Sequence, residues 1–125
     1  MNKKRILLVD DEPGVTTMTK LNLEKTGQFD VKVENHSTRV VDAARGFDPD
    51  LILMDITMPD MDGPEVMSKI RDDSKLSATP IVFLTAVVSK FETGDNELKR
   101  GGQVFLSKPV NMKTLLACIE QHARK

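Results

Sequence analysis

Five polar side chains stand at the ends of short apolar runs, and their types suit the chemistry of phosphate or of a hard metal ion. They are Asp10, Asp11, Asp55, Thr85 and Lys108. Carboxylates held close together repel one another, and at an effective dielectric constant near 20 a pair at about 4 Å costs roughly 4 kcal/mol. A hard divalent cation relieves this repulsion, and Mg²⁺ suits a few carboxylates, waters and an incoming phosphoryl group. Asp10, Asp11 and Asp55 therefore form a candidate Mg²⁺ cluster.

One of the aspartates could also act as a nucleophile and form an aspartyl phosphate. Such chemistry needs charge neutralisation on the phosphoryl oxygens and hydrogen-bond donors directed at them. Lys108 would supply an ammonium group and Thr85 a hydroxyl. Taken singly, an Asp-Asp-Glu-Pro string is more often the entry turn of a helix, and a Lys or Thr at a strand end is usually structural. The combination favours a phosphate or metal site.

Strands buried on both faces would bring these groups together. Continuous apolar runs of strand length are typical of a parallel sheet, and ligands of such sheets bind outside the carboxyl ends of the strands. The runs are residues 6–9, 51–54, 81–84 and 104–106, and residues 31–34 form a further short strand. They alternate with helix-like segments, which predicts an α/β fold.

Apolar spacing and capping residues mark the helices. Val15, Met18 and Leu21 mark one face of a helix that follows Pro13 and ends near Gly27. The other helices are marked by Val40, Val41, Ala44 and Phe47; by Val66, Met67 and Ile70 after a cap at Asp62; and by Met112, Leu115, Leu116 and Ile119 after a cap at Asn111.

The fourth helix, expected within residues 89–100, is the weakest. Only Phe91 and Leu98 anchor it, and Gly94 costs about 1 kcal/mol relative to Ala in a helix interior. Gly101 can end it. The pattern fits either a marginal surface helix or a mobile element.

Length and composition predict one domain over residues 1–125, in the cytoplasm. Eighteen basic and nineteen acidic side chains give no electrostatic argument for nucleic acid or an anionic membrane surface. The single cysteine, Cys118, excludes an intramolecular disulfide, fits a reducing compartment, and is expected to be buried or half-buried. The first apolar run ends at Val9, too short for a signal-peptide core or a membrane span.

Four motifs fit one family in order and spacing: ILLVDDEP, LILMDITMPDMDG, the LTA after the fourth strand, and the SKP near the end. Together they resemble a response-regulator receiver domain of two-component signalling (CheY-like), and the resemblance runs essentially end to end. It implies a doubly wound, flavodoxin-like (βα)5 fold. The five-stranded parallel sheet would have the order 2-1-3-4-5, with helices on both faces.

The resemblance also assigns roles to the five polar residues. It makes Asp55 the phosphoacceptor, and Thr85 and Lys108 the groups that bind the phosphoryl oxygens. It implies a cis Lys108–Pro109 bond. The Mg²⁺ (or Mn²⁺) ligands would be Asp10, Asp11, Asp55 and the backbone carbonyl of Thr57. In the switch, phosphorylation draws the Thr85 hydroxyl inward and an aromatic side chain rotates into the vacated space. Phe105 matches that aromatic position, where Tyr is frequent.

The partners implied are a sensor histidine kinase or a histidine phosphotransfer protein as donor, and a downstream protein or output domain. No direct nucleic-acid or membrane partner is expected, and the chain would be a monomer or a phosphorylation-dependent dimer. Catalysis is expected only of its own phosphoryl transfer and hydrolysis. The chain would be either a complete single-domain regulator or a piece of a larger protein. The expected output face combines the fourth helix, fifth strand and fifth helix, including Lys90, Lys99, Arg100, Phe105 and Lys113.

Three other functions share parts of this pattern. A phosphatase with an Asp nucleophile needs a second Asp two residues later, and that position is Glu12, directly before Pro13. A flavin-phosphate binder would suffer repulsion from the acidic first loop. A receiver-like docking domain that does not accept phosphate stays open as the alternative function.

Overall fold

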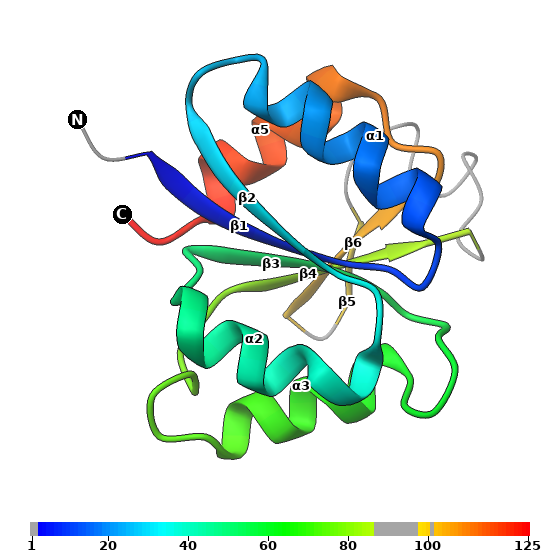
Figure 1. The fold of residues 1–125 in the computed structure, drawn as a ribbon, viewed down its shortest axis with the longest axis vertical. Coiled ribbons are helices and arrows are strands. Elements are labelled where there is room, and N and C mark those ends of the chain that lie inside the picture. The colour runs from blue at the N-terminus through cyan, green and yellow to red at the C-terminus, as the bar shows by residue number, and fades with distance from the viewer. Residues whose placement is uncertain (1–2, 87–97, 101) are drawn as a thin grey trace.

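A mostly parallel β-sheet forms the centre of the chain, with helices on both of its faces (Figure 1). The computed structural model describes residues 3–86, 98–100 and 102–125. The parallel strands are β1 (Lys4–Val9), β2 (Phe29–Glu34), β3 (Leu51–Asp55), β4 (Ile81–Thr85) and β6 (Gln103–Ser107). The order β2-β1-β3-β4-β6-β5 confirms the expected 2-1-3-4-5 order of the parallel strands and adds β5 (Leu98–Arg100), an antiparallel strand, at one edge.

The strands form where the apolar runs predict because each face of the sheet is covered. Helices α1 (Pro13–Glu24) and α5 (Met112–His122) lie on one face, and α2 (Val40–Phe47) and α3 (Gly63–Asp72) on the other (Figure 1). A short 3₁₀ helix, η1 (Ser37–Arg39), precedes α2. Neighbouring residues of one strand enter opposite cores: Ile6 and Leu8 pack with α5, whereas Leu7 and Val9 pack with α2 and α3. Cys118 is buried, as expected.

The two predicted helix caps are present. The Asp62 carboxylate accepts a hydrogen bond from the backbone N–H of Glu65, and the Glu65 carboxylate accepts one from the backbone N–H of Asp62. The two bonds form a capping box. The Asn111 side chain accepts from the N–H of Thr114 at 2.8 Å. Among the helices that the structure describes, none is both long and apolar enough to cross a membrane.

The apolar face of α1 that the sequence marks points to solvent. Val15, Met18 and Leu21 are 42%, 60% and 51% exposed, and the residues that α1 buries are Thr16 and Leu23. Three-residue spacing finds one side of a helix, but it does not say which side meets the sheet.

The predicted fourth helix is wrong for its last three residues. Residues 98–100 form β5, in which Arg100 pairs with Gln103 of β6, so that only two residues separate the paired positions. Both of those residues are glycines, and Gly102 has a φ of 80°, a backbone angle that residues with a side chain rarely adopt. A Gly-Gly pair is a signal for a tight hairpin. The rest of the predicted helix, residues 89–97, lies outside the described residues.

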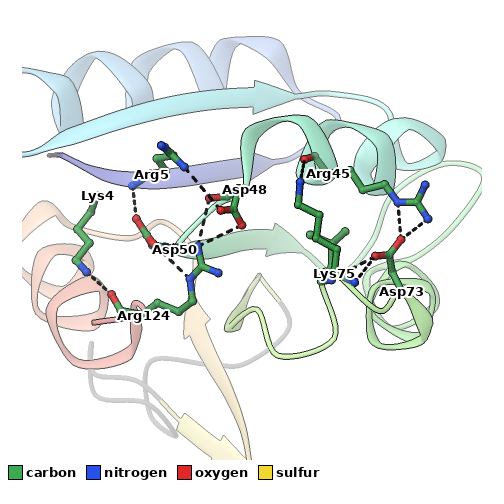
Figure 2. Close-up of polar contacts among 9 residues, drawn as sticks. Lys4, Arg5, Arg45, Asp48, Asp50, Asp73, Lys75 and Arg124 are labelled. Carbon is green, nitrogen blue, oxygen red and sulfur yellow. Dashed lines mark hydrogen bonds and ion pairs between the residues drawn. The ribbon is translucent and has the colours of Figure 1, made fainter.

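Ionic contacts join the two chain ends at the amino edge of the sheet (Figure 2). The Arg124 guanidinium lies 3.3 Å from Asp48 Oδ1 and 3.2 Å from Asp50 Oδ1. Asp50 also accepts from the backbone N–H of Arg5 at 2.9 Å, and the Lys4 ammonium donates to the Arg124 carbonyl. These contacts hold the start of β1 and the chain after α5 against the loop before β3.

A second ionic contact joins α2 to the segment after α3 (Figure 2). Burial alone would raise the pKa of Asp73, but the Arg45 guanidinium and the backbone N–H groups of Lys75 and Leu76 lower it below its ordinary value. The Lys75 ammonium donates to the Arg45 carbonyl at 2.9 Å. The end of α2 and the turn after α3 are therefore fixed to each other.

Candidate functional site

The register of the sheet brings the strand ends together at its carboxyl edge. Val9 pairs with Met54, and the residues that follow them in the sequence, Asp10 and Asp55, therefore become neighbours. Thr85 ends β4 opposite Ser107, and Lys108 follows directly. The five polar residues of the sequence pattern therefore meet at one edge because four parallel strands end there.

Asp10, Asp11 and Asp55 form an acidic cluster. One carboxylate oxygen from each residue lies within 4.8 Å of the others. Asp10 and Asp55 are only 2% and 8% exposed, whereas Asp11 is more open to solvent. Asp10 Oδ1 accepts from the backbone N–H of Glu12 at 3.0 Å and so fixes the entry to α1.

The Lys108 ammonium bridges two members of the acidic cluster. Its Nζ lies 2.7 Å from Asp10 Oδ2 and 3.3 Å from Asp55 Oδ1. The backbone N–H of Lys108 donates to the Thr85 carbonyl at 2.9 Å, which fixes the loop that carries the ammonium. The Lys108–Pro109 bond is cis, as the resemblance implied.

Burial and charge act on the pKa values in opposite senses at this site. Burial raises the pKa of Asp55, the Lys108 ammonium lowers it, and the carboxylates of Asp10 and Asp11 raise it again, so that the net shift is upward. For Lys108, burial would lower the pKa, but the hydrogen bond and charge of Asp10, with the charge of Asp55, raise it above its ordinary value. The lysine therefore stays cationic at neutral pH, beside carboxylates that repel one another.

The residues present fit a hard divalent cation. The cluster offers only oxygen donors at a spacing that one ion can bridge, and carboxylates with few protein ligands are typical of Mg²⁺ sites. Thr57 lies two residues after Asp55, on the loop between β3 and α3, and its side chain is exposed. The same loop thus carries Asp55 and the carbonyl that the resemblance adds to the ligand set.

The two predicted switch residues lie on neighbouring strands beside the cluster. Thr85 is 2% exposed at the end of β4. Phe105, on β6, is partly buried and packs against the core under α2 and α3. Its ring centroid lies 5.7 Å from that of Phe83, with the ring planes tilted by 31°. Aromatic pairs prefer offset or tilted arrangements of this kind to a face-to-face sandwich.

Gly63 is a site residue that the sequence analysis passed over. A Cβ at this position would lie 2.8 Å from the Asp55 carbonyl oxygen and 2.9 Å from the Phe83 ring. The Gly63 N–H also donates to the Ile56 carbonyl at 2.7 Å. The start of α3 therefore presses directly on the backbone of Asp55, and only glycine leaves room. In the sequence, the Asp-Gly-Pro string at the start of a helix indicates the helix cap, but it does not indicate that Gly63 contacts the backbone of Asp55.

A groove of about 620 Å³ lies beside the cluster, between α1 and the loop before α5. Glu12 and Lys108 line its end near the cluster, Val15 and Met18 line one wall, and Leu53 lines it from β3. The exposed apolar face of α1 is thus continuous with the edge that carries the acidic cluster.

Part of the expected output face can be placed. Lys113 is exposed on α5, and Phe105 lies on β6. Lys99 and Arg100 belong to β5 and not to a helix. Lys90 lies outside the part of the chain that the structure describes.

Comparisons with known proteins agree with this arrangement. The sequence matches the response regulator receiver domain family over residues 6–120. It is 38% identical to the response regulator Rre1 of Synechocystis sp. over 116 residues, which is 91% of this chain and 49% of Rre1. It is also 38% identical to Protein PilH of Pseudomonas aeruginosa over 123 residues, 92% of this chain and 93% of PilH. The chain thus spans about half the length of the first relative and nearly all of the second.

The structure is similar to the chemotaxis protein CheY4 of Vibrio cholerae. The TM-score is 0.80 at 28% identity, with 96% of this chain and 98% of CheY4 covered. Fold, strand order and family match point to one conclusion. The chain belongs to the response-regulator receiver domain family, whose members are phosphorylation-activated signalling switches of two-component systems and not classical enzymes.

Proposed function

We propose that Asp55 accepts the phosphoryl group and that Asp10, Asp11, Asp55 and the backbone carbonyl of Thr57 hold Mg²⁺ or Mn²⁺. The observation that carries the proposal is the Lys108 ammonium, which lies 2.7 Å from Asp10 and 3.3 Å from Asp55. A cation at this point attracts an anionic phosphoryl group to the carboxylates beside it. Of these, Asp55 is the last residue of the buried strand β3, whereas Asp10 follows the end of β1. A carboxylate cluster without that cation would support metal binding alone.

The proposed transfer forms and breaks one bond at phosphorus. A carboxylate oxygen of Asp55 attacks the phosphorus of a phosphohistidine, the P–N bond breaks, and the imidazole leaves with the electron pair. Lys108 and the Thr85 hydroxyl contact the phosphoryl oxygens and offset their charge. A bound divalent cation supplies further charge neutralisation. Hydrolysis by water later releases inorganic phosphate and restores the carboxylate, which is the only turnover proposed.

Phosphorylation would act on the neighbouring strands through added charge. The phosphoryl group carries roughly 1.5–2 negative charges and three acceptor oxygens, in place of the single charge of the carboxylate. The Thr85 hydroxyl moves toward these oxygens, and the Phe105 ring moves into the space that it leaves. Support comes from the position of Phe105, which lies on the strand beside β4 and three residues before Lys108.

The phosphodonor would dock on the exposed apolar face of α1. A phosphohistidine must reach Asp55 from outside the carboxyl edge, so its protein must cover one side of that edge. The face formed by Val15, Met18 and Leu21 adjoins it, and these are the large apolar side chains that are exposed in the described part of the chain. We assign this face to a helix of a histidine kinase or histidine phosphotransfer protein, because apolar grooves such as the one beside α1 commonly bind the apolar face of a helix.

The downstream partner would use the other side of the site. The proposed output face comprises β5, β6 and α5, with Lys99 and Arg100 on β5, Phe105 on β6 and Lys113 on α5. The protein is proposed to work in the cytoplasm, as a monomer or a phosphorylation-dependent dimer. The lone buried Cys118 agrees with a reducing compartment.

Incubation with Mg²⁺ and acetyl phosphate tests the phosphoacceptor. We expect an acid-labile mass gain of one phosphoryl group in the wild type and none in Asp55→Asn. No gain in the wild type would favour the docking domain that does not accept phosphate. Steady release of phosphate from phosphate monoesters would favour a phosphatase.

A pair of surface variants tests the donor face. Met18→Glu places a charge in the apolar face, whereas Ser68→Glu places one on exposed α3. With an autophosphorylated histidine kinase that phosphorylates the wild type, Met18→Glu should transfer about tenfold more slowly, as expected for a loss of about 1.4 kcal/mol in docking. Acetyl phosphate should phosphorylate both variants at the wild-type rate. Equal kinase rates for the two variants would contradict the assignment.

A further inference from the structure

The segment between β2 and α2 reaches both loops of the proposed metal site. Its first contact is made by Asn35, whose side-chain amide donates to the Asp10 carbonyl at 2.8 Å and to Thr16 Oγ1 at 3.0 Å. One amide group thus joins the end of β1 to the first turn of α1. Asn35, which is not part of the loop that carries Asp10 and Asp11, thus holds that loop in place.

The second contact is made by Ser37, two residues later. Its hydroxyl donates to the Pro59 carbonyl at 2.7 Å and accepts from the Met61 N–H at 3.2 Å. Ser37 is 4% exposed, so water does not compete for these bonds. Pro59 and Met61 lie on the loop that begins at Asp55.

The turn that Ser37 holds has an unusual backbone. The Met61 N–H also donates to the Pro59 carbonyl at 2.9 Å, which closes a three-residue turn around Asp60. Asp60 has a φ of 73°, a left-handed conformation that few residues other than glycine adopt. Such a conformation persists only where its surroundings hold it, and Ser37 bonds to both ends of this turn.

We propose that Asn35 and Ser37 are positioning residues that set the distance between the two loops of the metal site, through their hydrogen bonds to the Asp10 carbonyl and to the turn at Asp60. Neither residue touches the metal or the phosphoryl group. This inference rests on the proposed role of Asp55. Residues that orient metal ligands typically change metal affinity or activity by about 10- to 100-fold when they are removed.

The variants are Ser37→Ala and Asn35→Ala, with Thr26→Ala as the matched control. The Thr26 hydroxyl also donates to a carbonyl, that of Leu23 at 2.7 Å, and accepts from an N–H, that of Gln28 at 3.2 Å. It does so after α1, at the amino edge of the sheet. Thr26→Ala therefore removes the same bonding pattern away from the site. Ser37→Thr keeps the hydroxyl and tests for rescue.

Mg²⁺ binding is measured by calorimetry, since the chain has no Trp or Tyr to report it by fluorescence. We expect the Kd to rise about tenfold in Ser37→Ala and in Asn35→Ala, toward the lower end of the usual range. Thr26→Ala and Ser37→Thr should stay within about twofold of the wild type, because their site contacts are intact. Phosphorylation by acetyl phosphate should need about tenfold more Mg²⁺ for half its maximal rate, with the maximal rate itself near that of the wild type.

Urea unfolding of each variant separates positioning from stability. If Ser37→Ala and Asn35→Ala lose stability but bind Mg²⁺ as tightly as the wild type, the proposal is wrong. If Ser37→Ala does not fold, Asn35→Ala decides by the same measurement. A wild type that binds Mg²⁺ but gains no phosphate would instead refute the role of Asp55, and leave the effect on metal affinity to be judged on its own.

Discussion

Replacement of Asp55 by asparagine tests whether the acidic cluster stores repulsion. The change removes one charge from a buried group and keeps the shape of the side chain. Because the pKa of Asp55 is raised, folding without a divalent cation is less favourable with the charged form of this residue than with an uncharged one. We therefore expect the variant to be more stable than the wild type when no divalent cation is present.

The expected gain follows from the distances. Asp55 repels Asp10 and Asp11 across no more than 4.8 Å. At an effective dielectric constant near 20, each repulsion costs about 3.5 kcal/mol, or about 7 kcal/mol together. The attraction to the Lys108 ammonium at 3.3 Å offsets about 5 kcal/mol of this. Solvent around Asp11 screens most of the remainder, but the burial of the Asp55 carboxylate, which is the largest cause of its raised pKa, also disfavours its charge. Together these effects leave an expected gain of about 1–2 kcal/mol.

The assay is urea unfolding at neutral pH, followed by circular dichroism, in EDTA and again in 10 mM Mg²⁺. In EDTA the variant should unfold at higher urea than the wild type. Mg²⁺ should stabilise the wild type, because it binds the folded state alone, and should hardly change the variant. The control is Asp30→Asn, an exposed position on β2, which should stay within about 0.5 kcal/mol of the wild type.

Two results would refute the reasoning. A variant that is equally or less stable in EDTA would mean that Lys108 already compensates for the cluster. A variant stabilised by Mg²⁺ as strongly as the wild type would mean that the cation binds without Asp55.

Three further predictions concern the surroundings of the cluster. Gly63→Ala should cost about 1–3 kcal/mol by overpacking against the Asp55 carbonyl, whereas Gly46→Ala, with no atom within 4 Å of the added Cβ, should stabilise α2 by about 0.5–1 kcal/mol; equal urea midpoints would contradict this. As the pH is lowered, protons compete with Mg²⁺ for Asp55, so the Mg²⁺ affinity should fall. Because the pKa of Asp55 is raised, this fall should begin at a higher pH than for an aspartate with the ordinary pKa of about 3.9, and calorimetry at a series of pH values checks it. The lowered pKa of Asp73 adds stability that is fully present above about pH 3.9 and is lost as the pH falls through the lowered value, so the wild type should lose more stability than Asp73→Asn between pH 4 and pH 2; parallel curves would contradict it.

The sequence predicts the strand ends, and through them the acidic cluster, because burial on both faces leaves a plain apolar signal. Asp10, Asp55 and Thr85 each end such a run, and parallel register then brings them together. The caps at Asp62 and Asn111 were equally readable because their bonds span only three residues.

What the sequence did not reveal depends on contacts between distant segments. Gly63 matters because α3 approaches the backbone of Asp55, and Ser37 because its partner lies 22 residues away. The exposure of Met18 depends on how α1 packs, which spacing does not determine. The Gly-Gly pair before Gln103 is a hairpin signal, but in the sequence it competes with a weak helical pattern over the preceding residues.

The link between Lys4 and Arg124 has a practical meaning for anyone who wishes to attach this protein to something. The contact joins residues 120 positions apart, and it lies at the opposite edge of the sheet from Asp55, where the start of β1 meets the chain after α5 (Figure 1). A fluorescent fusion, a surface tether or a pulling handle attached beside this contact would lie at the amino edge of the sheet, away from Asp55. Such an attachment would leave the acidic cluster at the carboxyl edge accessible to the proposed phosphodonor. Two dyes attached beside Lys4 and Arg124 would start close together and would separate when the domain unfolds.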